Sequence, residues 1–138
     1  MYHLIYISTS HELMNEYELT DILAISRENN QEHGVTGMLL YAEGTFIQVL
    51  EGEQADVKKV LSKIINDGRH KNIIELASGP LDERDFPNWS MGFASGNAEV
   101  LKEFEGYINP ADLQGMKINN MGAAIIMLKS FAETNRLN

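Results

Sequence analysis

The sequence predicts an α+β protein with a ferredoxin-like β-α-β-β-α-β sheet, to which a further strand and C-terminal helices are added. Three observations predict it. Short apolar or alternating runs, which are typical of strands, occur four times within the first 80 residues. Two amphipathic segments, 18–33 and 53–67, lie between these runs. The order of the segments is that of a split β-α-β arrangement, in which both helices are expected to cover one face of the sheet.

The first half of the chain supplies a strand, a helix and a hairpin. Residues 2–8 alternate and predict a strand, with Leu4, Tyr6 and Ser8 on one face and His3, Ile5 and Ile7 on the other. The helix over 18–33 is expected to end at Gly34. The stretch "TGMLLYAEGTFIQVLEG" then predicts two strands joined by a turn at Glu43 and Gly44.

The second half begins with the helix over 53–67 and a strand over 72–78. After a loop, residues 89–95 predict a short fifth strand. From about Ala98 the pattern is helical, with a longer helix over 121–131. We therefore expect one folded domain over 1–97 and a helical extension over 98–138.

Composition limits the function classes. The 138 residues are 43% hydrophobic and 22% charged, as in soluble globular proteins. The chain has no cysteine, so disulfides and thiolate chemistry are excluded, and its four histidines lack metal-ligand spacing, so no metal site is expected. A net charge of −9 disfavours binding to nucleic acid or to an anionic membrane. No signal peptide is recognisable, and a cytoplasmic location is expected.

Two polar residues stand among apolar strand neighbours. Gln48 is the centre of the strand "FIQVL", and burying an amide without partners costs about 1–3 kcal/mol. It is therefore either solvent-facing or hydrogen-bonded in the interior. Tyr6 lies between Ile5 and Ile7, and its simplest interpretation is a half-buried tyrosine with its hydroxyl at the surface.

Three further segments carry polar or aromatic groups. "SRENN" ends the first helix, where Asn29 and Asn30 either cap the helix or present amides to a planar heterocycle. "DGRH", residues 67–70, is either a solvated turn or a carboxylate and a guanidinium that hold polar ligand atoms. "FPNWSMGF" places Trp89 and Met91 at alternate positions, as in a core strand. Together these segments suit a groove for a flat, partly polar ligand.

Six fragments resemble, in order, those of the BLUF family, the blue-light sensors that use FAD. They are "LIYIS", "SRENN", "GVTGMLLY", "FIQVLEGE", "DGRH" and "FPNWSMGF", and they cover roughly residues 2–95. The resemblance implies a flavin ring between the two helices and over the sheet. The flavin-binding positions that it implies are Tyr6, Ile22, Arg27, Asn29, Asn30, Gln48, Ile64, Asp67, Arg69 and His70.

The resemblance also implies a photochemical switch. Tyr6 would give an electron and a proton after blue light excites the flavin, and would then recover both. Gln48 would be left rotated or tautomerised, with a stronger hydrogen bond to the flavin C4=O and a small red shift. The change would reach the last strand at Trp89 and Met91. FAD is the expected cofactor, and FMN or riboflavin also fits, because the family recognises the ring more than the tail.

The same resemblance implies a sensor rather than an enzyme. No pattern of an effector domain follows the matched region, so we expect a short stand-alone sensor that signals to a separate protein partner and forms a homo-oligomer, a dimer or larger. The last predicted helix is the candidate contact surface, and packing of this helix on the back of the sheet is equally open. The alternatives are a flavin-dependent enzyme and a light-insensitive ferredoxin-like interaction module.

Overall fold

A computed structural model of the chain describes residues 1–10, 14–42, 44–68, 70–87, 92–95, 128 and 130–131, with the backbone alone for 16 and 92–95. The elements are β1 (Tyr2–Ser10), α1 (Glu16–His33), β2 (Thr36–Ala42), β3 (Thr45–Gly52), α2 (Gln54–Ile65), β4 (His70–Pro80) and β5 (Gly92–Ser95). Their kind and order are those predicted. The boundaries differ by a few residues, since β1 and β4 are longer than expected and α2 is shorter.

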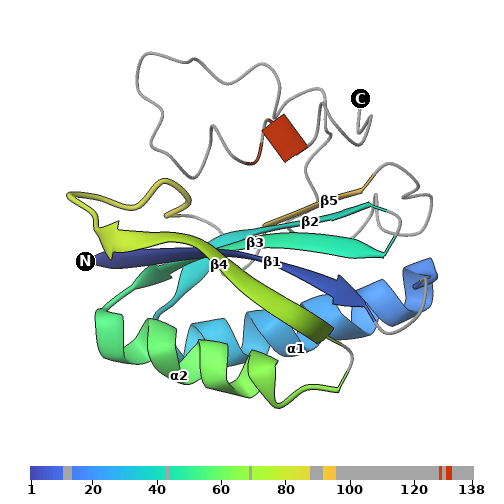
Figure 1. Cartoon of the computed structure of the whole chain (residues 1–138). Helices are drawn as coiled ribbons and strands as arrows, with labels where there is room; N and C mark the ends of the chain where they lie inside the picture. Colours follow the sequence, from blue (N-terminus) through green and yellow to red (C-terminus); the bar gives the residue numbers. More distant parts are fainter. Residues whose placement is uncertain are drawn as a thin grey trace.

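The strands form one five-stranded sheet in the order β4-β1-β3-β2-β5. The first four strands pair antiparallel, and β5 pairs parallel with β2 at the edge. Both α1 and α2 lie against the same face of the sheet (Figure 1). This confirms the expected two-layer, ferredoxin-like arrangement with an added strand. The register between β1 and β4 shifts between Ile5 and Tyr6, so β4 carries an irregularity beside Tyr6.

Local sequence explains where α1 begins and ends. The side chain of Asn15 accepts a hydrogen bond from the backbone N–H of Glu18 at 2.9 Å, and the Glu18 carboxylate accepts one from the Asn15 N–H, which is a capping box. At the other end Gly34 has a φ of 65°, the left-handed conformation that glycine adopts without a steric penalty. The expected end of the helix at Gly34 is confirmed.

The sheet carries a separate apolar cluster on each face, because strand side chains alternate. The helix-facing cluster includes Leu4, Tyr6, Leu19, Ile22, Leu23, Phe46, Leu50, Val57 and Val60. The far-face cluster comprises Ile5, Met38, Leu40, Ala42, Ile47, Val49, Phe86, Leu128 and Phe131. The predicted alternation of the first strand is thus confirmed. Each large apolar side chain buried in these clusters contributes on the order of 1.5–3 kcal/mol.

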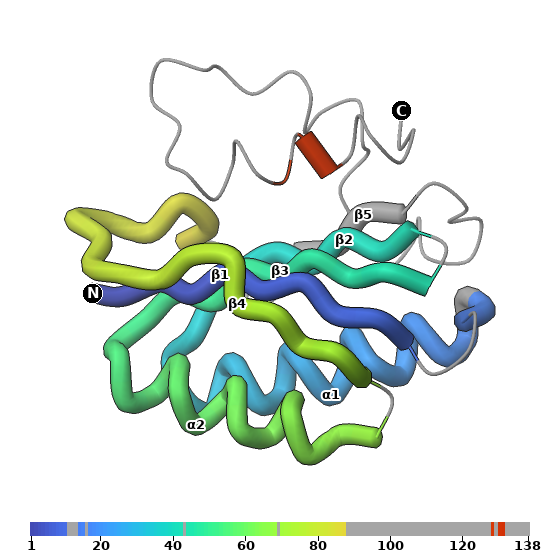
Figure 2. The backbone as a smooth tube through the Cα atoms, in the orientation of Figure 1, coloured from blue at the N-terminus to red at the C-terminus, as the bar shows by residue number. Residues whose placement is uncertain are grey.

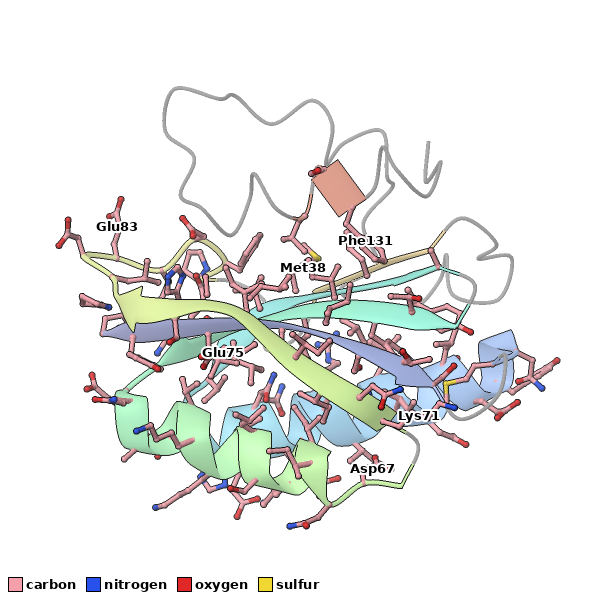
Figure 3. All side chains as sticks on the ribbon, in the orientation of Figure 1. Met38, Asp67, Lys71, Glu75, Glu83 and Phe131 are labelled. Carbon is pink, nitrogen blue, oxygen red and sulfur yellow. The ribbon has the colours of Figure 1, made fainter. Side chains whose placement is uncertain are left out.

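The far face is covered in part by residues that follow the sheet in sequence. The segment after β4 turns back over this face near the N-terminus of the chain, and the N–H of Leu81 donates to the carbonyl of Met1 at 3.0 Å (Figure 2). Phe131 and Met38 meet on the same face (Figure 3). Leu128, Ser130 and Phe131 are helical, within the predicted helix over 121–131.

Close packing of β2 on β3 depends on one glycine. A Cβ atom on Gly37 would lie 1.9 Å from the carbonyl oxygen of Val49, which is backbone and does not move aside as a side chain does. Glycine at this position therefore lets the two strands of the hairpin approach.

Several predictions fall outside the described residues. They concern Arg69, Trp89, Met91 and most of the extension over 98–138. Within the part of the chain that is described, no helix has both the length and the apolar character that crossing a membrane requires.

Candidate functional site

Tyr6 and Gln48 lie directly opposite each other on β1 and β3. Their side chains are 0% and 2% exposed, and the Tyr6 hydroxyl donates a hydrogen bond to Oε1 of Gln48. The solvent-facing interpretation of Gln48 is therefore wrong, and so is the surface hydroxyl expected for Tyr6. Both groups are enclosed because the helices cover this face, and neither strand alone reveals that cover.

The environment of Tyr6 favours its neutral form. Burial raises the pKa of Tyr6 above its usual value of 10.0, and the negative charge of Asp67 raises that pKa further. The phenol thus keeps its proton at physiological pH and acts as a donor. Because Oε1 of Gln48 accepts the hydrogen bond from Tyr6, the NH₂ group at the other end of the amide points away from Tyr6.

Gln48 forms part of the wall of a cleft between the two helices. The cleft has an empty volume of about 400 Å³, counting its open mouth. Its lining residues are Ile22, Ile25, Ser26, Asn29 and Asn30 of α1, Gln48 of β3, Val60, Lys63 and Ile64 of α2, and Asp67 and His70 beyond α2. The helices thus supply apolar walls, and the amides and charged groups supply a polar rim.

Asn30 is buried near the end of α1 and is one of the residues that line the cleft. The capping interpretation of this segment is wrong, because the cap is Gly34, whose N–H donates to the carbonyls of Asn30 and Gln31. Asn29 lies nearer the surface, where its Oδ1 accepts a hydrogen bond from Nζ of Lys63 at 3.4 Å.

His70 closes the cleft beside the end of β1. Its Nδ1 lies 3.2 Å from Oγ of Ser8, and its ring packs on Phe46 with the centroids 4.8 Å apart. His70 is buried, so a fully solvated turn is the wrong description of this part of "DGRH". Asp67 also lines the cleft.

Most of the predicted site residues are therefore brought together. Tyr6 does not line the cleft itself but is hydrogen-bonded to Gln48, which does. Arg27 is not among the described residues that line the cleft. Lys63 lines the cleft and Ser8 contacts His70, and neither was predicted as a site residue. Both carried a weak signal, since Lys63 directly precedes Ile64 and Ser8 shares a strand face with Tyr6.

The family described as BLUF, sensors of blue light using FAD, matches residues 1–92. The chain belongs to this family. BLUF proteins bind a flavin, and the chemistry of the lining fits one, because the cleft combines apolar side chains from both helices with amides that offer donors and acceptors.

Individual relatives agree with this assignment. The photoactivated adenylate cyclase subunit alpha of Euglena gracilis is 35% identical over 101 residues, which are 73% of this chain and 10% of that protein. The structure of BlrB, a BLUF protein in its dark state, matches 99% of this chain and 92% of BlrB, with 27% identity and a TM-score of 0.66. BlrP1 of Klebsiella pneumoniae, in complex with FMN and cyclic diGMP, matches 96% of this chain and 34% of BlrP1, with 25% identity and a TM-score of 0.74. The chain spans about a tenth of the first curated relatives that it matches.

Proposed function

We propose that this BLUF chain is a blue-light photoreceptor that binds FAD non-covalently between α1 and α2 and switches a hydrogen-bond network on illumination. The observation that carries the proposal is the buried hydrogen bond from Tyr6 to Gln48, whose amide also lines the cleft. A tyrosine that retains its proton beside an amide with two unlike ends is suited to reversible rewiring.

The cleft residues would hold the flavin in two ways. Ile22 and Ile64 would pack on the two faces of the ring, and Asn30 would bond its C4=O and N3–H edge. Asp67, Arg69 and His70 are proposed to lie at the polar edge of the ring and along the ribityl chain, with Asn29 at the rim. Support for this arrangement comes from the joint lining of one cleft by Ile22, Asn29, Asn30, Ile64, Asp67 and His70.

A bound flavin would supply absorption of blue light and reversible uptake of an electron. Tyr6 would then give up an electron and its phenolic proton, with Gln48 Oε1 as the first acceptor of that proton, and would recover both. Gln48 would end rotated or tautomerised, so that its new donor strengthens the bond to C4=O. The chain returns to its starting state in the dark, so it would act as a switch and not as a catalyst.

The identity of the flavin tail is a separate proposal. We propose FAD, with FMN and riboflavin as alternatives, and the BlrP1 complex with FMN is an example of a relative that holds the shorter cofactor. Lys63 at the rim of the cleft and Arg27 of α1 are the positive groups proposed to meet phosphates.

The output is proposed to pass to a separate protein partner, through the last strand at Trp89 and Met91 and through the C-terminal extension. Homo-oligomerisation and a cytoplasmic location belong to the same proposal. Its support is the far-face cluster, in which Leu128 and Phe131 of the extension pack against the sheet behind Gln48.

The test is an absorption spectrum of the purified protein before and after blue light, with recovery followed in the dark. A flavin spectrum that shifts slightly to the red and returns is the expected result. A flavin that bleaches or does not respond would contradict the switch and favour a flavin-dependent enzyme. Failure to bind added FAD, FMN or riboflavin would instead favour an interaction module.

A further inference from the structure

Glu51 of β3 is a fully buried carboxylate on the face of the sheet opposite the cleft, three residues after Gln48. Its two oxygens accept three hydrogen bonds. The backbone N–H of Asp85 donates to Oε2 at 2.7 Å, and the N–H of Phe86 donates to Oε1 at 2.8 Å. The hydroxyl of Thr36 also donates to Oε1, at 3.2 Å. A buried side chain that accepts this many hydrogen bonds holds its partners firmly, because a buried donor that loses its acceptor is costly.

Arg84 ties the same segment to the hairpin strands from the outside. Its Nη1 donates to the Thr36 hydroxyl at 2.8 Å and to the Glu51 carbonyl at 3.0 Å, while its Nη2 donates to the Gly34 carbonyl at 2.7 Å. The next residue but one, Phe86, is buried in the far-face cluster. Residues 84–86 are therefore fixed near the beginning of β2 and the end of β3 by hydrogen bonds that each involve a side chain, and by the apolar packing of Phe86.

These anchored residues lead into β5. Only five residues separate Phe86 from Gly92, which is the register partner of Met38 on β2. The next pair joins Phe93 to Leu39, and Leu39 is also the partner of Gln48 on β3. The residues that Glu51 holds therefore precede β5 by only a few positions. Within β5, Phe93 is the residue aligned with Gln48, through their common neighbour Leu39.

Contacts outside β5 must fix how this strand aligns with β2. β5 has four residues and pairs parallel with β2, so no tight turn joins the two strands and sets their alignment. A slip of one residue would turn every side chain of a strand to the opposite face. The position at which the chain enters the strand therefore decides which side chains face the helices.

We propose that Glu51 is a positioning residue that sets the register of β5 on β2 by holding the backbone of Asp85 and Phe86. The role deepens the proposed function and rests on it in one respect: the register would decide which residues before β5 a rearranged Gln48 can influence. The anchoring itself does not depend on light.

The experiment is amide hydrogen exchange by NMR on flavin-loaded protein in the dark, comparing wild type with Glu51→Gln. Glutamine keeps the size of the side chain but places an NH₂ group where Asp85 N–H or Phe86 N–H requires an acceptor. We expect exchange at Gly92–Ser95 to quicken by about tenfold or more, and exchange in the core of β1 and β3 to change by less than about twofold.

Glu83→Gln is the matched control. It makes the same chemical change in the loop that Glu51 holds, and Glu83 is an exposed residue at the outer edge of the molecule (Figure 3). It should leave exchange at β5 within about twofold of wild type. Equal exchange at β5 in Glu51→Gln and wild type would overturn the proposal, and so would a uniform increase over the whole sheet, which is what a purely stabilising role gives.

A measurement on wild type decides the matter if Glu51→Gln does not fold. The amides of Asp85 and Phe86 should open together with those of β5, with the same dependence on denaturant, and should be protected at least about tenfold more than Glu83. Opening at Asp85 and Phe86 while β5 stays protected would contradict the proposal. A failure of the light response leaves both exchange tests intact, so the two proposals fail separately.

Discussion

Tyr6 and Gln48 face each other across the β1–β3 ladder, and the phenol of one donates to the amide oxygen of the other in an enclosed site. Each group is the polar partner that makes burial of the other tolerable. Removing either one leaves a buried donor or acceptor unsatisfied, which costs about 1–3 kcal/mol. The pair is therefore expected to affect both the stability and the light response of the protein.

Gln48→Leu should keep a folded, flavin-binding protein and abolish the light-induced red shift. Leucine fills the space, but the Tyr6 hydroxyl loses its acceptor, so unfolding free energy should fall by about 1–3 kcal/mol. The shift is read by absorption difference spectra and the stability by urea unfolding. Gln54→Leu, which removes an exposed amide at the start of α2, is the control and should respond normally. A red shift that persists in Gln48→Leu would remove this amide from the mechanism.

Tyr6→Phe should give a yellow protein without the reversible photocycle, because the phenolic proton and the electron donor are both lost. Time-resolved absorption after a blue flash is the measurement. Tyr17→Phe makes the same change on a side chain that is 71% exposed and should cycle as wild type does. The role assigned to Tyr6 would be untenable if its phenylalanine variant recovered with a normal red-shifted state.

Asn30→Ala should weaken flavin binding by about tenfold to a hundredfold, since the loss of one or two good hydrogen bonds to a buried ring costs about 1.4–2.7 kcal/mol. Fluorescence titration of the apoprotein with FAD measures the effect. Asn29→Ala is the neighbouring control, and it should weaken binding by less than about threefold because that amide lies at the rim beside Lys63. Equal affinities for the two variants would argue against a direct contact from Asn30.

Gly37→Ala should destabilise the fold severely, by about 3 kcal/mol or more, because the new Cβ meets the Val49 carbonyl at 1.9 Å. The comparison is Gly68→Ala, where a Cβ has no neighbour within 4 Å and stability should stay the same or rise by up to about 1 kcal/mol. Urea unfolding separates the two cases. A mild effect at Gly37 would mean that β2 and β3 can move apart without loss of pairing.

Glu51 should give stability an unusual pH dependence. Burial raises its pKa above the ordinary 4.5, although the hydrogen bonds from Asp85, Phe86 and Thr36 oppose the shift. The folded state then binds this proton more tightly than the unfolded state, so its contribution is largest below about pH 4.5 and is lost as pH rises through the folded-state pKa. Unfolding free energies between about pH 4 and about pH 7 should therefore show the advantage of wild type over Glu51→Gln shrinking as pH rises. An advantage that grows with pH would show that the pKa of Glu51 is lowered instead.

Much of this fold follows from local patterns. The alternation of β1, the stripe of α1, the glycine at position 34 and the hairpin turn each have a physical cause within a few residues, and the family resemblance added their arrangement around a flavin. The burial of Gln48 could not be predicted from its neighbours in the sequence. Its neighbours are apolar, but whether it faces water depends on helices that are distant in sequence, and here they enclose it.

The anchor at Glu51 was missed for a related reason. A glutamate at the end of a strand has an ordinary solvent-exposed interpretation, and its partners at Asp85 and Phe86 lie more than thirty residues away in a loop without regular pattern. Lys63 was missed because a basic residue in the last turn of a helix already has a local explanation in the helix dipole. Only the three-dimensional arrangement brings it to the rim of the cleft.

Side chains of β3 alternate between the two faces of the sheet, so the two faces can be substituted separately. Gln48 lines the cleft on the helix-facing side, while Val49 and Glu51 point to the far face. The cleft and the far-face cluster therefore have no β3 side chain in common. Far-face substitutions that keep Glu51 should leave the Tyr6–Gln48 hydrogen bond on the helix-facing side in place. A chimera that keeps the helix-facing positions and Glu51, and takes its other far-face positions from a relative, should preserve the colour response and, on the proposed route of the output, change the recipient of the signal.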